Sequence, residues 1–145
     1  MRALFDIAYH SAGLSTQVKD ISARQGISPR YIEQIFQKIK RAGIVKSIRG
    51  PSGGYYLARS PDEIKVGDVI RATEGNIDLV FCLSHKKAAG KTCDRVSQCV
   101  ARDVWGEASA RLMDYLDSIT LQDLCKRAQE RGVERVIDKH LMYYI

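Results

Sequence analysis

Three of the four cysteines stand close together in the second half of the chain, with a spacing that suits a metal site. Cys82 is followed by ten residues, Cys93, five residues and Cys99. Thiolates are the usual protein ligands of iron-sulfur clusters, whereas structural zinc sites normally show tighter C-x-x-C pairs. The small residues at 88–90 favour a flexible loop, which could bring separated cysteines onto one cluster. The spacing is therefore compatible with an iron-sulfur site.

A second interpretation of these cysteines is that they are small buried hydrophobes or form a disulfide. The start of the chain, MRALFDIAYH, is too polar and too short for a secretory signal, and no run of about 18 apolar residues predicts a membrane span. We therefore expect a cytoplasmic protein with no membrane partner, in which clustered cysteines favour metal or redox chemistry. Cys125 lies among Leu121, Leu124 and Ala128 and is expected in the core.

The longest predicted helix follows the cysteines and runs from Val100 to about Asp117. Its apolar residues form one stripe at helical spacing: Val100, Val104, Trp105, Ala108, Leu112, Tyr115, Leu116 and Ile119. A small domain cannot cover a helix of that length, but a symmetric partner helix could, so we expect a homodimer. Two further helical pieces are expected, over Leu121–Arg131 and Val133–His140.

The first half of the chain has the pattern of a helix-turn-helix. A first helix is expected over Met1–Ala12, and a second over Gln17–Gln25. Ser15 and Thr16 are candidate caps of the second helix because a hydroxyl oxygen can accept an unpaired backbone N–H. Gly26 suits the left-handed residue that ends such a helix.

The third helix is predicted to start at Ser28, as N-cap, with Pro29 in the first helical position. Its apolar stripe comprises Ile32, Ile35, Phe36 and Ile39. Its opposite face is polar, and consists of Arg30, Glu33, Gln34, Gln37, Lys38 and Arg41. Two helices that meet through a tight turn form a helix-turn-helix, so the polar face predicts recognition of DNA.

Positive charge is concentrated in the same part of the chain. The net charge is +6, and residues 14–59 carry nine Lys or Arg against two Asp or Glu, a local charge of +7. A basic segment beside a nearly neutral one is typical of a phosphate-binding module. A solvated basic face without a ligand is the alternative, and the turn pattern favours DNA.

Two short β-type runs, Ile44–Ile48 and Tyr55–Ala58, follow the third helix and are joined by the sequence RGPSGG. This pattern predicts a hairpin, and a hairpin after a helix-turn-helix is a wing. Its glycines let the backbone approach a phosphate, and Arg49 could enter a narrow minor groove. The loop does not match a nucleotide-binding pattern.

The expected fold is therefore mainly α with a small β wing: a winged helix-turn-helix plus a long dimerisation helix. We divide it into a DNA-binding domain over residues 1–75, a cysteine-bearing sensor loop over 76–99, and a dimerisation helix with a helical tail over 100–145. A short helix is expected over Val66–Thr73. No nucleophile-base pair or nucleotide loop stands out, so an enzyme is not expected.

The run ISPRYIEQIFQKIKRAGIVKSIRGPSGGYYLARSPDEIKVGDVIRATEG resembles the Rrf2 family of bacterial transcriptional regulators. The segments SIRGPSGGYYL and VGDVIRATEG are highly specific to that family, and the resemblance covers nearly the whole chain. It implies a dimer on a double-stranded, near-palindromic operator, with the long helices crossing at the dimer interface.

The resemblance also implies which residues contact DNA. These are Ser28, Arg30, Tyr31, Glu33, Gln34, Lys38, Arg49, Gly50, Ser52 and Gly53. Arg can pair with guanine, Gln with adenine, and Glu can accept from cytosine. Glu33 facing a wrong base would be costly, so it could also exclude other sequences.

By the same resemblance, Cys82, Cys93 and Cys99 would ligate an iron-sulfur cluster, of 2Fe-2S or 4Fe-4S type. The fourth ligand stays open. One branch of the family has His three positions after the last cysteine, where this chain has Arg102, and another uses an N-terminal Asp from the partner subunit. Local substitutes are His85, Asp94 and Asp103. The expected function is a repressor-type regulator whose operator binding is switched by a cluster that senses redox state, iron-sulfur status or nitric oxide.

The apolar C-terminus, LMYYI, supports an alternative function. It resembles the tail of a family member that regulates cysteine metabolism together with cysteine synthase. Tyr144 and Ile145 would then bind the synthase, since a free carboxylate with an apolar side chain suits a pocket. In this alternative the protein regulates sulfur metabolism without a cluster. Packing of the tail on the dimer would explain the same residues.

Overall fold

Three helices at the start of the chain support the rest of the fold. The structure, a computed structural model, describes residues 1–51, 53–83 and 93–136. The three helices are α1 (Arg2–His10), α2 (Val18–Gln25) and α3 (Pro29–Arg41). Gly26 ends α2 with φ 63°, and the Ser28 hydroxyl accepts the Tyr31 N–H at 3.4 Å to start α3. The predicted helix-turn-helix is confirmed.

The core of this module is built from one face of each helix. Its fully buried side chains include Leu4, Ile7, Ile21, Ile32, Phe36, Ile39, Ile44 and Ile64. Each such residue contributes about 1.5–3 kcal/mol relative to an exposed position. The predicted stripe of α3 is thus the face that anchors it, and its polar face is left outward.

A buried ion pair adds specificity to the packing of α1 on α2. Asp6 is fully buried and lies 2.7 Å from Nη2 of Arg24, and it also accepts from Gln25 Nε2 at 2.8 Å. Breaking such a pair leaves a charge buried without a partner and costs about 3–5 kcal/mol. The pair thus joins α1 to α2 beside the apolar core.

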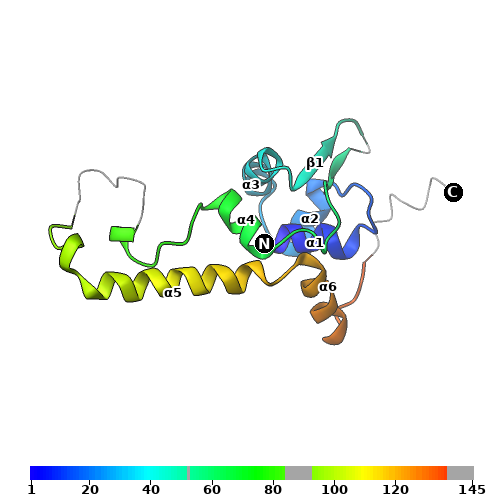
Figure 1. Cartoon of the computed structure of the whole chain (residues 1–145). Coiled ribbons are helices and arrows are strands. Elements are labelled where there is room, and N and C mark those ends of the chain that lie inside the picture. The colour runs from blue at the N-terminus through cyan, green and yellow to red at the C-terminus, as the bar shows by residue number, and fades with distance from the viewer. Residues whose placement is uncertain (52, 84–92, 137–145) are drawn as a thin grey trace.

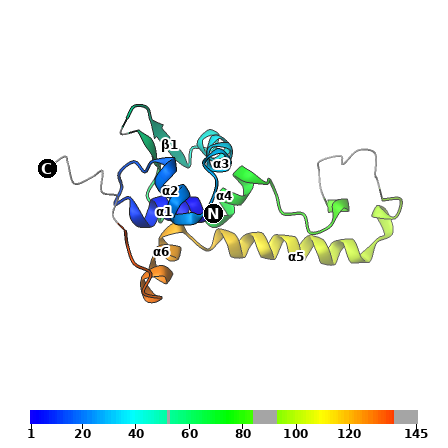
Figure 2. The same cartoon turned by 180° about the vertical axis from the view of Figure 1, so that it is seen from behind.

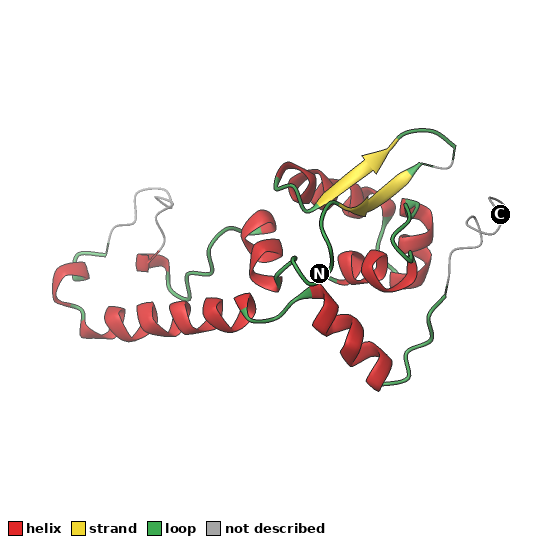
Figure 3. Ribbon diagram, turned by 45° about the vertical axis from the view of Figure 1, so that its right-hand side comes forward, coloured by secondary structure: helices red, strands yellow, loops and turns green. Residues whose placement is uncertain are grey.

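The wing is an antiparallel hairpin of β1 (Val45–Ile48) and β2 (Gly54–Leu57), drawn as yellow arrows in Figure 3. The prediction that Thr16 caps α2 is wrong: the N-cap is Gln17, without a side-chain bond. Thr16 instead forms an isolated bridge with Tyr55, through two backbone hydrogen bonds of 2.8 and 2.9 Å. At Thr16, backbone pairing with the distant strand β2 therefore takes the place of the expected side-chain cap.

The second half of the chain leaves this module and returns to it (Figures 1 and 2). It contains α4 (Val66–Thr73), the short 3-10 turns η1 (Phe81–Leu83) and η2 (Val96–Gln98), α5 (Val100–Asp117) and α6 (Leu121–Glu130). Helix α5 projects away from the module, and α6 packs against α1. A capping box starts α6, in which Thr120 Oγ1 accepts the Asp123 N–H at 3.1 Å.

In the C-terminal half, the structure confirms the prediction for Cys125 and differs from the predictions for Ile119 and for residues 133–136. Cys125 is in the core as expected, 6% exposed, and burial raises the pKa of its thiol. Ile119 is buried in the module and is not part of an exposed stripe. Residues 133–136 of the predicted Val133–His140 helix are not helical: Val133 O accepts the Tyr9 hydroxyl at 2.7 Å, and Val136 N–H donates to His10 Nδ1 at 3.0 Å. Within the described residues, no helix is long and apolar enough to cross a membrane.

Candidate DNA-binding surface and cysteine loop

The N-terminal half of α3 carries the predicted base-reading residues on an open face. Arg30, Glu33 and Gln34 are all exposed, as are Ser28 and Tyr31. The opposite face is sealed, because Ile32, Phe36 and Ile39 are at most 1% exposed. A helix that is fixed on one side and polar on the other can be inserted into a major groove without losing its core contacts.

The wing is packed directly on α3. The rings of Phe36 and Tyr55 meet edge to face with centroids 4.7 Å apart. Burial raises the pKa of the Tyr55 hydroxyl, and the negative charge of Glu33 raises it further. The recognition helix and the hairpin therefore form one continuous surface.

The wing tip owes its shape to glycine. Gly50 has φ 118° and accepts the Gly53 N–H at 2.9 Å. A Cβ on Gly53 would lie 2.5 Å from the Ile48 carbonyl oxygen, which no side chain could tolerate. The turn itself thus requires these glycines, and it leaves Arg49 exposed. Ser52, the remaining predicted contact of the wing, lies outside the described residues.

Gln17 supports the wing tip and was missed by the sequence reasoning. Its Nε2 donates to the Pro51 carbonyl at 3.0 Å. Directly after the turn, a Cβ on Gly54 would lie 2.3 Å from the Thr16 carbonyl oxygen, so the segment that precedes α2 lies directly on the strand. No local pattern links residues so far apart in the sequence.

The basic residues near the end of α3 have different surroundings. Lys38 Nζ donates to the Thr73 carbonyl of α4 at 2.9 Å, and Lys40 Nζ to Ser47 Oγ of β1 at 2.6 Å. Arg41 and Lys46 are exposed. These side chains lie farther along the helix from the base-reading residues, which suits phosphate contacts better than base contacts.

The three clustered cysteines lie at the end of α5 that is remote from the DNA-binding module (Figure 1). Cys82 is in η1, Cys93 precedes η2 and Cys99 is the N-cap of α5. All three are free thiols of intermediate exposure, unlike the buried Cys125. They are therefore accessible to a metal or an oxidant.

One face of α5 holds the segment that leads to these cysteines. Arg102 Nε donates to the Cys82 carbonyl at 3.4 Å, and the Leu79 N–H donates to Ser109 Oγ at 3.3 Å. The Leu83 side chain packs beside Gly106, where an added Cβ would lie 3.7 Å from it, an ordinary contact. Arg102, where one family branch has His, thus ties the Cys82 segment to the start of the long helix.

The cysteines are not drawn together into a closed ligand set. Across residues 1–51, 53–83 and 93–136, no group of three His, Cys, Asp or Glu side chains could hold a metal ion. Asp94 and Asp103 are exposed, and His85 lies outside the described residues. Three thiols are suitable ligands for an iron-sulfur cluster. To bind one cluster together, the three cysteines would have to move closer to one another.

The outer face of α5 is apolar and uncovered. Val100 is 81% exposed, Val104 66%, Trp105 46% and Tyr115 59%. An apolar stripe of this size on a projecting helix marks an interaction surface. By contrast, Tyr144 and Ile145, the predicted partner-binding residues, lie outside the described residues.

Comparisons with known proteins agree with this geometry. Residues 1–127 match the Rrf2 family, described as an iron-dependent transcriptional regulator. The HTH-type transcriptional regulator IscR of Aliivibrio salmonicida is 42% identical over 137 residues, which are 94% of this chain and 77% of the relative. IscR of Pectobacterium atrosepticum is 38% identical over 131 residues, which are 90% of this chain and 77% of that protein.

Two solved structures are similar throughout. The IscR structure from T. potens has a TM-score of 0.71 and 38% identity, and the match covers 99% of this chain and 89% of that one. CymR, the global cysteine regulator of B. subtilis, has a TM-score of 0.67 and 34% identity, and the match covers 86% of this chain and 88% of that one.

Proposed function

Because the chain belongs to the Rrf2 family of transcriptional regulators, we propose that it binds operator DNA as a dimer and that an iron-sulfur cluster on Cys82, Cys93 and Cys99 sets its affinity. The predicted family, the winged-helix fold and the absence of an enzymatic role are confirmed by its relatives, which are transcriptional regulators. The assignments to single residues are our proposal.

The observation that carries DNA binding is the joint surface of α3 and the wing. In our proposal Arg30, Glu33 and Gln34 read base edges in the major groove. Arg49, exposed at the wing tip, enters the adjacent minor groove. Ser28, Tyr31 and Lys38, with the backbone at Gly50 and Gly53, contact the sugar-phosphate backbone and set the register.

The apolar stripe of α5 is the proposed dimer interface. Four of its large side chains are between 46% and 81% exposed, while the segment 77–83 covers a different face of the helix through Ser109 and Arg102. A second copy of the same helix is the natural occupant, since a two-fold axis pairs like surfaces. Two copies would also present two recognition helices to a palindromic operator.

A bound cluster would supply a centre whose integrity depends on iron, oxidants and nitric oxide. Cys82, Cys93 and Cys99 would hold it, and Asp94 or Asp103 is a candidate fourth ligand. Because Arg102 joins the Cys82 carbonyl to α5, ordering of the cysteine loop would act on the dimerisation helix. Control by cysteine synthase, the alternative from the sequence, has no support from the described residues or the relatives.

Anaerobic purification of three matched proteins tests the cluster. We expect the parent and Cys125→Ala to contain iron and absorb in the visible range, because Cys125 is buried in the core. Cys93→Ala should lose both signals while it keeps its helical content. Equal iron content in Cys93→Ala and the parent would contradict the ligand assignment, and an iron-free, colourless parent would contradict the cluster.

A further inference from the structure

The junction between α4 and α5 contains a polar contact that joins the two halves of the molecule. We propose that Gly67, Arg71 and Asp117, here called the α4–α5 clamp, fix the angle between the long helix and the DNA-binding module, and so determine which spacing of operator half-sites the dimer accepts. This inference rests on the proposed binding of DNA as a dimer.

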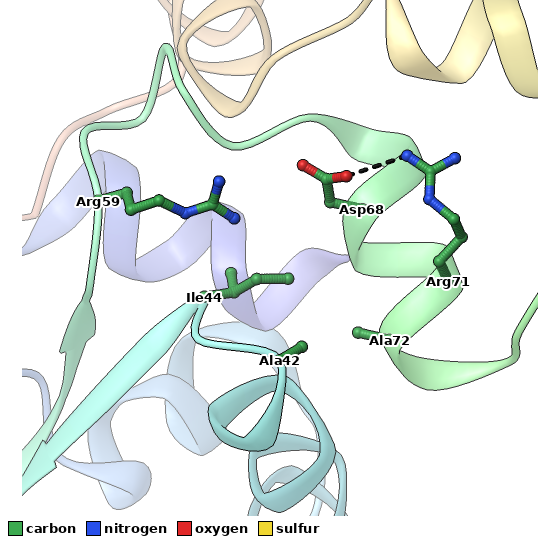
Figure 4. Close-up of a pocket in the computed structure, with 6 residues that line it drawn as sticks. All are labelled: Ala42, Ile44, Arg59, Asp68, Arg71 and Ala72. Atoms are coloured by element: carbon green, nitrogen blue, oxygen red, sulfur yellow. Dashed lines mark hydrogen bonds and ion pairs between the residues drawn. The ribbon is translucent and has the colours of Figure 1, made fainter.

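Arg71 makes a bidentate contact with Asp117 at the end of α5. Nη1 donates to Asp117 Oδ2 at 3.0 Å and Nη2 to Oδ1 at 2.6 Å. The same Nη2 donates to Asp68 Oδ1 at 3.0 Å, the pair drawn with a dashed line in Figure 4. A two-point contact restricts orientation as well as distance, which a single-point lysine contact cannot do.

Gly67 makes room for this contact. A Cβ at this position would lie 1.8 Å from Asp117 Oδ1 and 2.9 Å from its Cγ. The clash would be with the end of a side chain, so an alanine would push the carboxylate aside and leave the backbone in place. The absence of a side chain on α4 is therefore a requirement of the clamp.

Backbone hydrogen bonds place the clamp at the point where α5 joins the module. The Val66 N–H donates to Ile119 O at 2.8 Å, and the Leu121 N–H to Ile64 O at 2.9 Å. These bonds hold Ile119 and Leu121, which follow α5 in the chain. Asp117 is the last residue of α5, so its contact with Arg71 acts on the helix itself.

The clamp is connected to the recognition helix through α4. Helix α4 packs on α3, and Lys38 of α3 donates to the Thr73 carbonyl at the end of α4. The other covalent link between the module and the cysteine end, residues 74–80, contains no helix or strand. Helix α4, which contacts both α3 and α5, is thus a direct structural link between them.

Orientation matters because α5 is long. Its 18 residues span about 27 Å, and two half-sites read by a dimer lie about 34 Å apart, one turn of DNA. If the dimer pairs through α5, a change of its angle to the module moves the two recognition helices relative to each other. If the angle between α5 and the module is fixed, the dimer binds one half-site spacing. If the angle varies, the dimer binds several spacings.

The test compares full-length variants on operators whose half-sites are moved closer or farther apart by single base pairs. Arg71→Lys keeps the charge and loses the two-point contact, and Gly67→Ala displaces Asp117 without removing a charge. Arg131→Gln is the matched control, since this exposed residue ends α6 away from the clamp. Circular dichroism and sedimentation establish that every variant is folded and dimeric.

We expect the parent and Arg131→Gln to bind one half-site spacing much more tightly than the others. In both clamp variants, the ratio of affinities between the preferred and the altered spacings should fall at least about fivefold. Affinity for an isolated half-site should change little. Undiminished preference in both folded clamp variants would overturn the inference while DNA binding by the dimer stands. A parent that binds no operator, or binds as a monomer, would instead overturn the proposed function.

Discussion

The exposed residues of α3 differ in what each could contribute to DNA binding. Arg30 is in the first turn of α3, and the first turn is the part of a recognition helix that usually contacts base edges. Lys38 is two turns later and donates to Thr73 O. A base contact should affect affinity for one sequence, whereas a phosphate contact should affect all sequences alike.

Arg30→Ala is therefore expected to weaken specific binding by about 1–3 kcal/mol and to relax the preference at one base pair. Lys38→Gln should weaken binding to all sequences and lower the salt slope by about one. Fluorescence titrations of matched and single-mismatch operators over a range of salt concentrations measure both. The assignment of Arg30 to base reading fails if its variant loses affinity uniformly for every sequence.

Single residues also show where sequence reasoning succeeds. Ser28-Pro29 predicts the start of α3 because a capping hydroxyl and a restricted φ act locally. Thr16 also has a hydroxyl just before a helix, but it does not cap α2. Its backbone instead pairs with Tyr55 of β2. Gln17 and Asp117 carry no local signal at all, since their partners are 34 and 46 residues away.

At the scale of elements, the wing depends on a close approach between backbones. Gly54 of β2 lies so near the Thr16 carbonyl that any side chain would force the strand away. Gly106 of α5 is different, since an added Cβ would make only an ordinary contact with Leu83. Alanine substitutions at these two glycines therefore compare a position that has no room for a side chain with one that has room.

Gly54→Ala is expected to lower the free energy of unfolding by about 1–3 kcal/mol through overpacking and to weaken DNA binding as the wing shifts. Gly106→Ala should raise stability by up to about 1 kcal/mol, because alanine favours the helix. Thermal unfolding of both variants checks the signs. A Gly54→Ala protein as stable as the parent would show that Thr16 does not constrain the strand.

The α4–α5 clamp should also be visible as a pH dependence. Hydrogen bonds from Arg71 lower the pKa of Asp117 below its ordinary value of 3.8, and raise the pKa of Arg71. A carboxyl with a lowered folded-state pKa stabilises the fold above its ordinary pKa, and this contribution disappears as the pH falls through the folded value.

The difference in melting temperature between the parent and Asp117→Asn is therefore expected to be constant near neutral pH and to shrink as the pH falls below about 4. Melting curves recorded from neutral to acid pH measure it. A difference that stays the same down to pH values well below 3.8 would show that the ion pair is not its source.

At the scale of the whole molecule, the chain is a DNA-binding module with a projecting helix that nothing in the described protomer covers on its apolar side. The sequence predicted a projecting helix, since the apolar stripe expected from Val100 to Ile119 was too long for a small domain to cover. It could not predict that Ile119 turns into the core, because a helical period does not show where α5 ends and the chain returns to the module.

Val104→Lys is expected to abolish or strongly weaken dimerisation, since it places a charge on the stripe. Ala110→Lys is the control, because Ala110 is exposed outside the stripe. Sedimentation over a range of protein concentrations measures the dissociation constant of each. Both variants dimerising like the parent would exclude this face of α5 as the interface.

In the proposed function, cluster occupancy at Cys82, Cys93 and Cys99 changes operator affinity through α5. This effect is tested most directly by titrating an operator with the same anaerobic full-length preparation before and after its iron is chelated, with Cys93→Ala alongside. We expect chelation to shift the affinity of the parent, and we expect Cys93→Ala to match the chelated parent and not to respond to chelation. Identical binding curves for the iron-loaded and the chelated parent would contradict it.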